Sequence, residues 1–198
     1  MKEPITAYVI ISDIHAGCQL GMYPCNLASG ELLLDEGGEY TPNAIQRGMW
    51  AWWEEFWGEH VPAMTNGLPY GVIVNGDSLD GKHHDAVHQI THNLSTQQRI
   101  AEAILRPIVD LCEGRFYMIR GTEAHVGPSG QQEEMLASAL GAVKSDIGQS
   151  ARHELWKKIG SHMVHIAHTI GGTSSQSYES TAVHKEYVEA LAESARWG

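Results

Sequence analysis

The sequence VIVNGD at residues 72–77 consists of an apolar run followed by one asparagine, a glycine and a carboxylate. A short apolar run rich in β-branched residues is typical of a strand that is buried on both faces of a sheet. Gly76 permits close approach of the backbone to a ligand. Ligands of open α/β sheets bind just beyond the carboxyl ends of the strands. The stretch therefore predicts a strand over 71–75 that delivers Asp77 to a binding site.

Three further apolar runs, at 5–11, 115–119 and 162–167, end in the same kind of side chain. The residues that follow them are Asp13 and His15, Glu123 and His125, and His168. Each short motif alone is better explained as a turn, a cap or a packing residue, but their ordered recurrence predicts one shared metal site. Carboxylate together with imidazole suits Mn, Fe or Zn better than Ca.

The segments between these runs predict helices outside a sheet. Thr41 is the expected N-cap, with Pro42 as first helical residue, and an aromatic stripe follows that we interpret as core rather than as a base-stacking platform: Ile45, Met49, Trp52, Trp53, Phe56 and Trp57. Further elements are expected in the following ranges: a helix from Asn93 or Thr96 toward Cys112, a helix over 131–140, a β-hairpin over 155–168 and a helix over 178–197. This order predicts an α/β sandwich with helices outside.

Composition indicates one globular domain over residues 1–198, with 42% hydrophobic and 19% charged residues. No apolar run approaches the ~20 residues of a membrane span, and no signal peptide is recognisable, so we expect no membrane association and a cytoplasmic protein. Three cysteines without zinc-finger spacing are expected to be reduced thiols. A formal net charge of −11 disfavours broad electrostatic capture of nucleic acid. It leaves open a small phosphate ester held by cations.

Taken together, the motifs resemble those of the calcineurin-like metallophosphoesterases. The resemblance spans about residues 5–172 and rests on four short segments: SDIH at 12–15, NGDSLD at 75–80, RGTEAH at 120–125 and HTIG at 168–171. It implies an α/β/β/α fold, in which helices flank a β-sandwich, and a hydrolase of phosphoester bonds. The implied cofactors are two divalent metal ions that polarise the phosphoryl oxygen and supply a bound hydroxide for in-line attack.

The resemblance also implies a role for each matching residue. Asp13 and His15 hold the first ion, Asp77 bridges the two ions, and His168 holds the second. His125 is then a catalytic residue near the leaving oxygen, as general acid or charge stabiliser, rather than a ligand. Asp80 is expected to be a loop or cap residue.

The chain departs from the family pattern in two places. The third motif lacks the usual Asn ligand, and we expect Glu123 rather than Thr122 to replace it, because an anionic oxygen is the stronger ligand. No Gly-His-x-His motif follows His168, and the sequence ends at Gly198. We therefore expect a fold without its last strands, either as a truncated fragment that binds metal weakly or as a minimal form.

Several alternatives stay open from sequence. The chain is expected to act on a phosphoester substrate that is a small molecule or a nucleotide, but it could instead be a non-catalytic metal-binding or scaffold domain, or a nuclease with the same centre. Additional histidines follow Asp77 and could contact the substrate, although a polar surface is the simpler interpretation: His83, His84, His88 and His92. Neither the native metal nor the oligomeric state follows from the sequence.

Overall fold

The computed structural model describes residues 5, 7–35, 37–82, 86–127, 129–169 and 180–197. The chain divides into two compact units, Met1–His168 and Thr169–Gly198. Every residue that the sequence assigns to the metal site falls in the first unit. In chain order the elements are β1 (Tyr8–Ile11), α1 (Ala44–Glu55), the π-helix η1 (Phe56–His60), α2 (Val61–Thr65), β2 (Gly71–Asn75), α3 (Leu94–Leu111), β3 (Phe116–Ile119), α4 (Glu123–Val126), α5 (Gln131–Leu140), β4 (Ala151–Arg152), β5 (Glu154–Ile159), β6 (His162–Ala167) and α6 (Ser180–Trp197).

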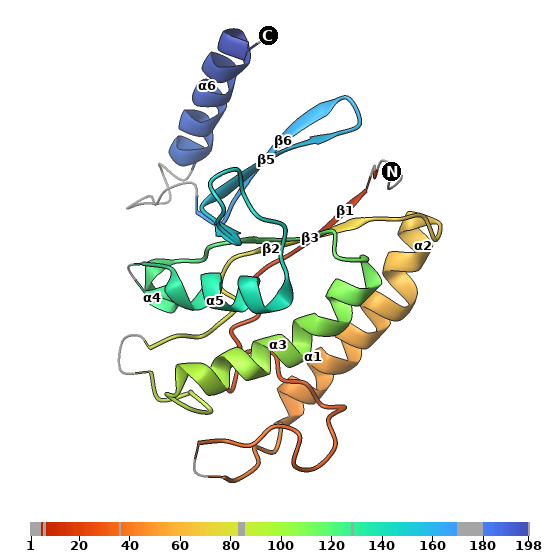
Figure 1. The fold of residues 1–198 in the computed structure, drawn as a ribbon, viewed down its shortest axis with the longest axis vertical. Helices are drawn as coiled ribbons and strands as arrows, with labels where there is room; N and C mark the ends of the chain where they lie inside the picture. The colour runs from red at the N-terminus through yellow and green to blue at the C-terminus, as the bar shows by residue number, and fades with distance from the viewer. Residues whose placement is uncertain are drawn as a thin grey trace. The chain divides into compact units, whose positions relative to one another are not determined.

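The first unit is organised by a four-stranded parallel sheet with strand order β1-β2-β3-β4. Val9 pairs with Val72 and Val72 with Phe116, so the three longer strands run in register and end at the same edge. The antiparallel hairpin β5-β6 forms a separate two-stranded sheet. The predicted α/β class is therefore confirmed, and the hairpin lies where the sequence predicts it (Figure 1).

The two faces of the parallel sheet bury different parts of the chain because strand side chains alternate. Val72 and Val74 of β2 face a large core formed with the helices, whereas Ile73 between them packs against the hairpin residues Leu155 and Ile166. Helices α1, α3 and α5 accordingly lie on one side of the sheet and the hairpin on the other (Figure 1). Both faces are covered, which explains the continuous apolar sequence of β2.

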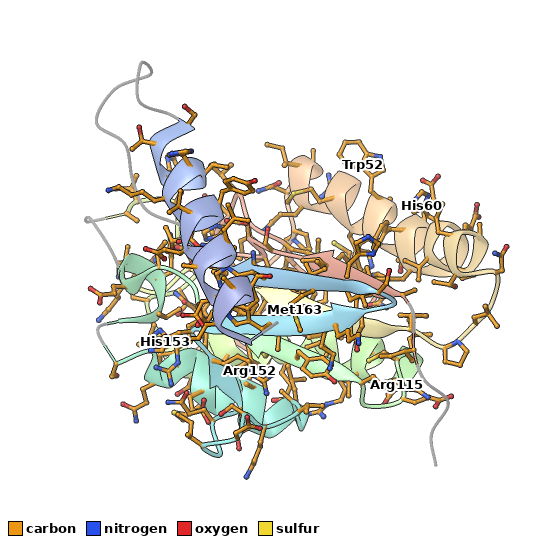
Figure 2. All side chains as sticks on the ribbon, turned by 90° about the horizontal axis from the view of Figure 1, so that it is seen from above. Trp52, His60, Arg115, Arg152, His153 and Met163 are labelled. Atoms are coloured by element: carbon orange, nitrogen blue, oxygen red, sulfur yellow. The ribbon has the colours of Figure 1, made fainter. Side chains whose placement is uncertain are left out.

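Helix α1 corrects two expectations. Its N-cap is Asn43, two residues after the expected N-cap Thr41, because Asn43 and Gln46 form a reciprocal capping box. Its buried residues are Gln46 and Trp50, and Trp57 is buried in the following η1, whereas Trp52 is 72% exposed and points outward (Figure 2). The buried face is hard to recognise in the sequence because Gln46 is polar. It is nevertheless buried, because its amide donates hydrogen bonds to the carbonyls of residues 18 and 21.

The start of strand β4 is held by the carboxylate of Glu134, which lies on α5. Glu134 accepts the N–H groups of Ser150 and Ala151, each at 2.8 Å. Burial raises the pKa of the Glu134 carboxyl, but the two N–H donors and the nearby Arg120 outweigh burial, so this pKa lies below its ordinary value. A carboxyl with a lowered folded-state pKa stabilises the fold above its unfolded-state pKa, and this stabilisation disappears as pH falls through the folded-state value.

We therefore expect Glu134→Gln to melt lower than the wild type at pH 7. Gln keeps one acceptor oxygen and loses about one hydrogen bond of roughly 1 kcal/mol, which corresponds to about 2–4 °C in a chain of this size. The difference should shrink as pH falls below the ordinary carboxyl pKa of 4.5. Thermal unfolding followed by circular dichroism across pH 3–7 measures it, and a difference that does not change with pH would contradict the assignment.

None of the helices in the described ranges has the length and apolarity to cross a lipid bilayer.

Candidate metal centre

The ends of β1 and β2 remain paired beyond the last ladder residues. Asp13 donates its N–H to the carbonyl of Gly76 at 3.2 Å, and His15 donates its N–H to the carbonyl of Asp77 at 2.9 Å. These two backbone hydrogen bonds hold the loops in register. Both side chains from the first loop are thereby placed beside Asp77 at the carboxyl edge of the sheet.

The backbone of these loops is strained at the three predicted metal ligands. Asp13, His15 and Asp77 have φ values of 57°, 46° and 49°. The structure describes five non-glycine residues with positive φ, and these are three of them. Such conformations cost of order 1–3 kcal/mol each and cluster at functional sites. Positive φ and metal-ligand side chains therefore coincide at the same three residues.

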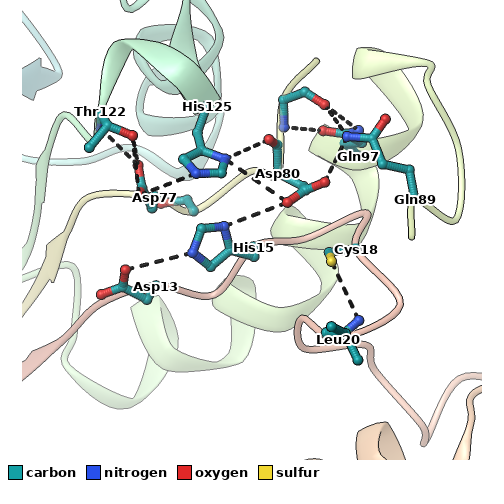
Figure 3. A network of polar contacts seen from close by, with 12 residues as sticks. Asp13, His15, Cys18, Leu20, Asp77, Asp80, Gln89, Gln97, Thr122 and His125 are labelled. Carbon is teal, nitrogen blue, oxygen red and sulfur yellow. Dashed lines mark hydrogen bonds and ion pairs between the residues drawn. The ribbon is translucent and has the colours of Figure 1, made fainter. Parts of the chain in front are cut away.

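Two groups of three side chains offer ligand atoms for a metal ion, and Asp77 belongs to both. One group is His15, Asp77 and His125, and the other is Asp13, Asp77 and His168; within each group the atoms lie within 4.8 Å of one another. Figure 3 shows the first group together with Asp13. A carboxylate has two oxygens, so Asp77 can contact a cation on either side. Asp13 shares a ligand group with His168 and not with His15, although its Oδ1 also lies 3.6 Å from Nε2 of His15.

Backbone carbonyls fix the ring orientation of two of these histidines. Nδ1 of His168 lies 2.6 Å from the carbonyl oxygen of Asn75, and Nδ1 of His125 lies 2.6 Å from that of Asp80. A carbonyl only accepts, so each Nδ1 carries the proton. Nε2 of each ring then faces the Oδ2 atom of Asp77, at 3.1 Å for His168 and 3.8 Å for His125. Metal-bound histidines are usually held by this arrangement.

His15 lies between two carboxylates. Its Nε2 is 3.6 Å from Asp13 and its Nδ1 is 3.7 Å from Asp80, while its ring meets that of His125 edge to face at 4.5 Å. The hydrogen bond to Asp80 raises the pKa of His15, burial opposes it, and the charges of Asp77, Asp80 and Asp13 add to the rise. The surroundings therefore favour positive charge at this position.

Two carboxylates of the site, those of Asp77 and Asp80, are buried, whereas that of Asp13 is exposed. Asp77 is 4% exposed and Asp80 is 3% exposed. Within the described ranges, the ion-pair partners of Asp13 and Asp77 are all histidines. Buried carboxylates close together are stable when a cation lies among them. The donor set thus fits divalent metal ions with mixed oxygen and nitrogen ligands.

Glu123 is the predicted ligand that the structure does not bring to Asp77. It begins α4, is exposed, and lies outside both ligand groups. Thr122 precedes it as N-cap, donates its N–H to Oδ1 of Asp77 at 2.8 Å, and places its hydroxyl 3.3 and 3.4 Å from the two carboxylate oxygens. The chain turns into the helix immediately after Thr122, so the next side chain leaves the site.

Asp80 and Glu133 are parts of this site that the sequence interpretation missed. Asp80 was expected only in a loop or cap role, but it contacts both His15 and His125 and accepts from Gln89 at 2.7 Å. Glu133 is fully buried on α5, beside Leu136 in the core stripe. A charged residue in a helix's apolar stripe was the available signal for Glu133.

A cavity of about 450 Å³ adjoins the centre on the side of His125. Its lining includes Lys82, Leu94 and Gln131 as well as His125 itself. Of the further histidines, His88 and His92 are exposed in a non-helical segment and belong to neither ligand group. His83 and His84 lie outside the described residues.

The arrangement is thus a pair of ligand groups joined by one carboxylate, with an open cavity beside it. Comparisons of the chain with protein-family models, curated proteins and solved structures found no match.

Proposed function

We propose that this chain is a metal-dependent hydrolase of phosphoester bonds with a binuclear centre, built on an α/β/β/α fold of the metallophosphoesterase kind. The observation that carries the proposal is the position of Asp77, which both ligand groups share. A carboxylate between two groups of this type is what a two-metal site needs to hold its ions a few ångströms apart. The covering of one sheet face by helices and of the other by a hairpin supports the fold.

The contacts of His168 fit a bound metal ion. Its Nδ1 proton points at a carbonyl, and its Nε2 faces Asp77 Oδ2, 3.1 Å away. Two lone pairs at that distance repel each other unless a cation or a second ring proton lies between them. A divalent cation would satisfy both atoms at once, and Asp13 would complete its ligand group.

In this proposal Asp13, Asp77 and His168 would hold one ion, and Asp77 and His15 would hold the other. Bound there, two divalent ions would neutralise charge on the phosphoryl oxygens and activate water as the nucleophile. His125, the third member of the second group, is assigned to catalysis instead of metal binding. His125 lines the adjoining cavity and lies farther from Asp77 than His168 does. Protonated on both nitrogens, His125 donates Nδ1–H to the carbonyl of Asp80 and offers Nε2–H to the leaving oxygen.

The test is hydrolysis by the full chain after loading with Mn²⁺. We expect Mn²⁺-dependent release of phosphate or alcohol from at least one substrate in a panel of phosphomonoesters, phosphodiesters and nucleotides, and its loss after chelation. Single-stranded DNA belongs in the panel because cleavage of it would indicate a nuclease. Calorimetric titration with Mn²⁺ should show two sites. Two occupied metal sites without hydrolysis of any substrate would overturn the proposed enzymatic activity and would indicate a metal-binding domain.

A further inference from the structure

Glu133 is a carboxylate without solvent exposure that belongs to neither ligand group. Its Oε1 accepts the N–H of Ser78 at 2.9 Å, and its Oε2 accepts the N–H of Gly121 at 2.6 Å. Burial raises the pKa of this carboxyl, and the two N–H donors oppose that effect. Burying an ionisable group is costly even when it is hydrogen-bonded, so an apolar residue in the same stripe of α5 would be the cheaper choice for packing alone.

The two donors flank the shared carboxylate of the metal centre. Ser78 directly follows Asp77, and Gly121 directly precedes Thr122, whose N–H donates to Oδ1 of Asp77 at 2.8 Å. The contacts close a ring that runs from Asp77 through Ser78 to Glu133, and back through Gly121 and Thr122 to the Asp77 side chain. One buried carboxylate thus joins the loop that carries Asp77 to the loop that orients it.

We propose that Glu133 is a positioning residue for Asp77 and sets the affinity of the centre for its metal ions. The proposal rests on the binuclear centre proposed above. Partners of metal ligands that are not ligands themselves typically change metal affinity by about 10–100-fold when they are altered. Glu133 acts on Asp77 through backbone N–H groups from two loops, so its loss should weaken both ions.

The neighbouring Glu134 supplies a matched control. It too accepts two backbone N–H groups through the two oxygens of its carboxylate, but its donors are Ser150 and Ala151 at β4. Glu133→Gln and Glu134→Gln therefore make the same chemical change at adjacent positions of one helix. In each variant the amide keeps one acceptor oxygen and sets an NH₂ group against the second N–H donor.

The experiment is calorimetric titration of the full wild-type chain and both variants with Mn²⁺, at a temperature where near-UV circular dichroism shows all three folded. We expect Glu133→Gln to bind Mn²⁺ about 10-fold more weakly or worse, and Glu134→Gln to bind as the wild type does. Both variants should melt below the wild type, so a general loss of stability cannot produce the difference in affinity. Should Glu133→Gln fail to fold, Glu133→Asp, which keeps two acceptor oxygens on a shorter side chain, carries the same comparison with Glu134→Asp.

Each remaining outcome has a separate meaning. Wild-type affinity in Glu133→Gln would overturn the role of Glu133 and leave the metal centre standing. Equal weakening in both variants would show that destabilisation of α5 alone affects binding, and would also overturn it. A wild-type chain that binds no Mn²⁺ would overturn the binuclear centre, and the role of Glu133 with it.

Discussion

Asp77→Asn should abolish binding of both metal ions and reduce phosphoester hydrolysis at least about a thousandfold. The carboxylate belongs to both ligand groups, so neutralising it removes an anionic ligand from each ion. Metal ions supply several kcal/mol of charge stabilisation in such reactions, and a loss of about 4 kcal/mol corresponds to about a thousandfold in rate. Calorimetry with Mn²⁺ and hydrolysis of the best substrate of the panel measure the two effects.

Asn is the informative replacement because it preserves the local structure. It tolerates the positive φ of 49° at this position, and its carbonyl oxygen can still accept the N–H of Thr122. It also removes one charge from a group of buried carboxylates, so the metal-free variant should melt no lower than the wild type. A metal-free variant that is destabilised would mean that Asp77 has a structural role instead.

Asp35→Asn provides the control for this substitution. Asp35 is also a carboxylate that accepts from a threonine, with Oδ1 2.6 Å from the hydroxyl of Thr96. It belongs to neither ligand group. We expect this variant to retain Mn²⁺ binding and activity. Retention of two bound ions by Asp77→Asn would contradict the binuclear centre, whatever its activity.

Strands and helices of the first unit follow closely from the sequence where one simple pattern decides them. The range 71–75 is a strand in the structure, and the helix over 131–140 has the predicted bounds. The strand has a continuous apolar run and the helix has a clear apolar stripe. Each is followed by a glycine, Gly76 or Gly141. Helix α1 was less predictable because the buried Gln46 interrupts its apolar stripe, and its partners at residues 18 and 21 lie in a distant loop.

Ligand type was more predictable than ligand arrangement. Apolar strands that end in Asp or His indicate where polar groups emerge, so Asp13, His15, Asp77 and His168 could be selected from sequence. Which of them lie in one candidate ligand group depends on loop conformation, and three of these residues have positive φ. Side-chain alternation does not extend to such residues. The same limit explains why Thr122 rather than Glu123 meets Asp77: the start of α4 redirects the chain between them.

Gly121→Ala should disrupt the centre by a steric effect alone. A Cβ atom at this position would lie 2.0 Å from Oδ1 of Asp77 and 2.3 Å from its backbone nitrogen. These distances are far below van der Waals contact, so Asp77 or the 120–122 loop must move. Overpacking of this kind costs about 1–3 kcal/mol, and a displacement of about 1 Å in a site can cost 10²-fold in function. We expect a lower Tm together with Mn²⁺ affinity reduced at least about 10-fold.

Gly48→Ala is the matched control for the added methyl group. Gly48 lies within α1, and a Cβ there meets no atom within 4 Å. Ala is favoured over Gly inside helices by about 1 kcal/mol, so this variant should melt higher than the wild type and bind Mn²⁺ equally well. Opposite shifts in Tm for the same added methyl group would identify contact with Asp77 as the cause of the lower Tm of Gly121→Ala. If Gly121→Ala instead binds Mn²⁺ and melts as the wild type does, the close approach of the two loops at Asp77, on which the binuclear arrangement depends, is wrong.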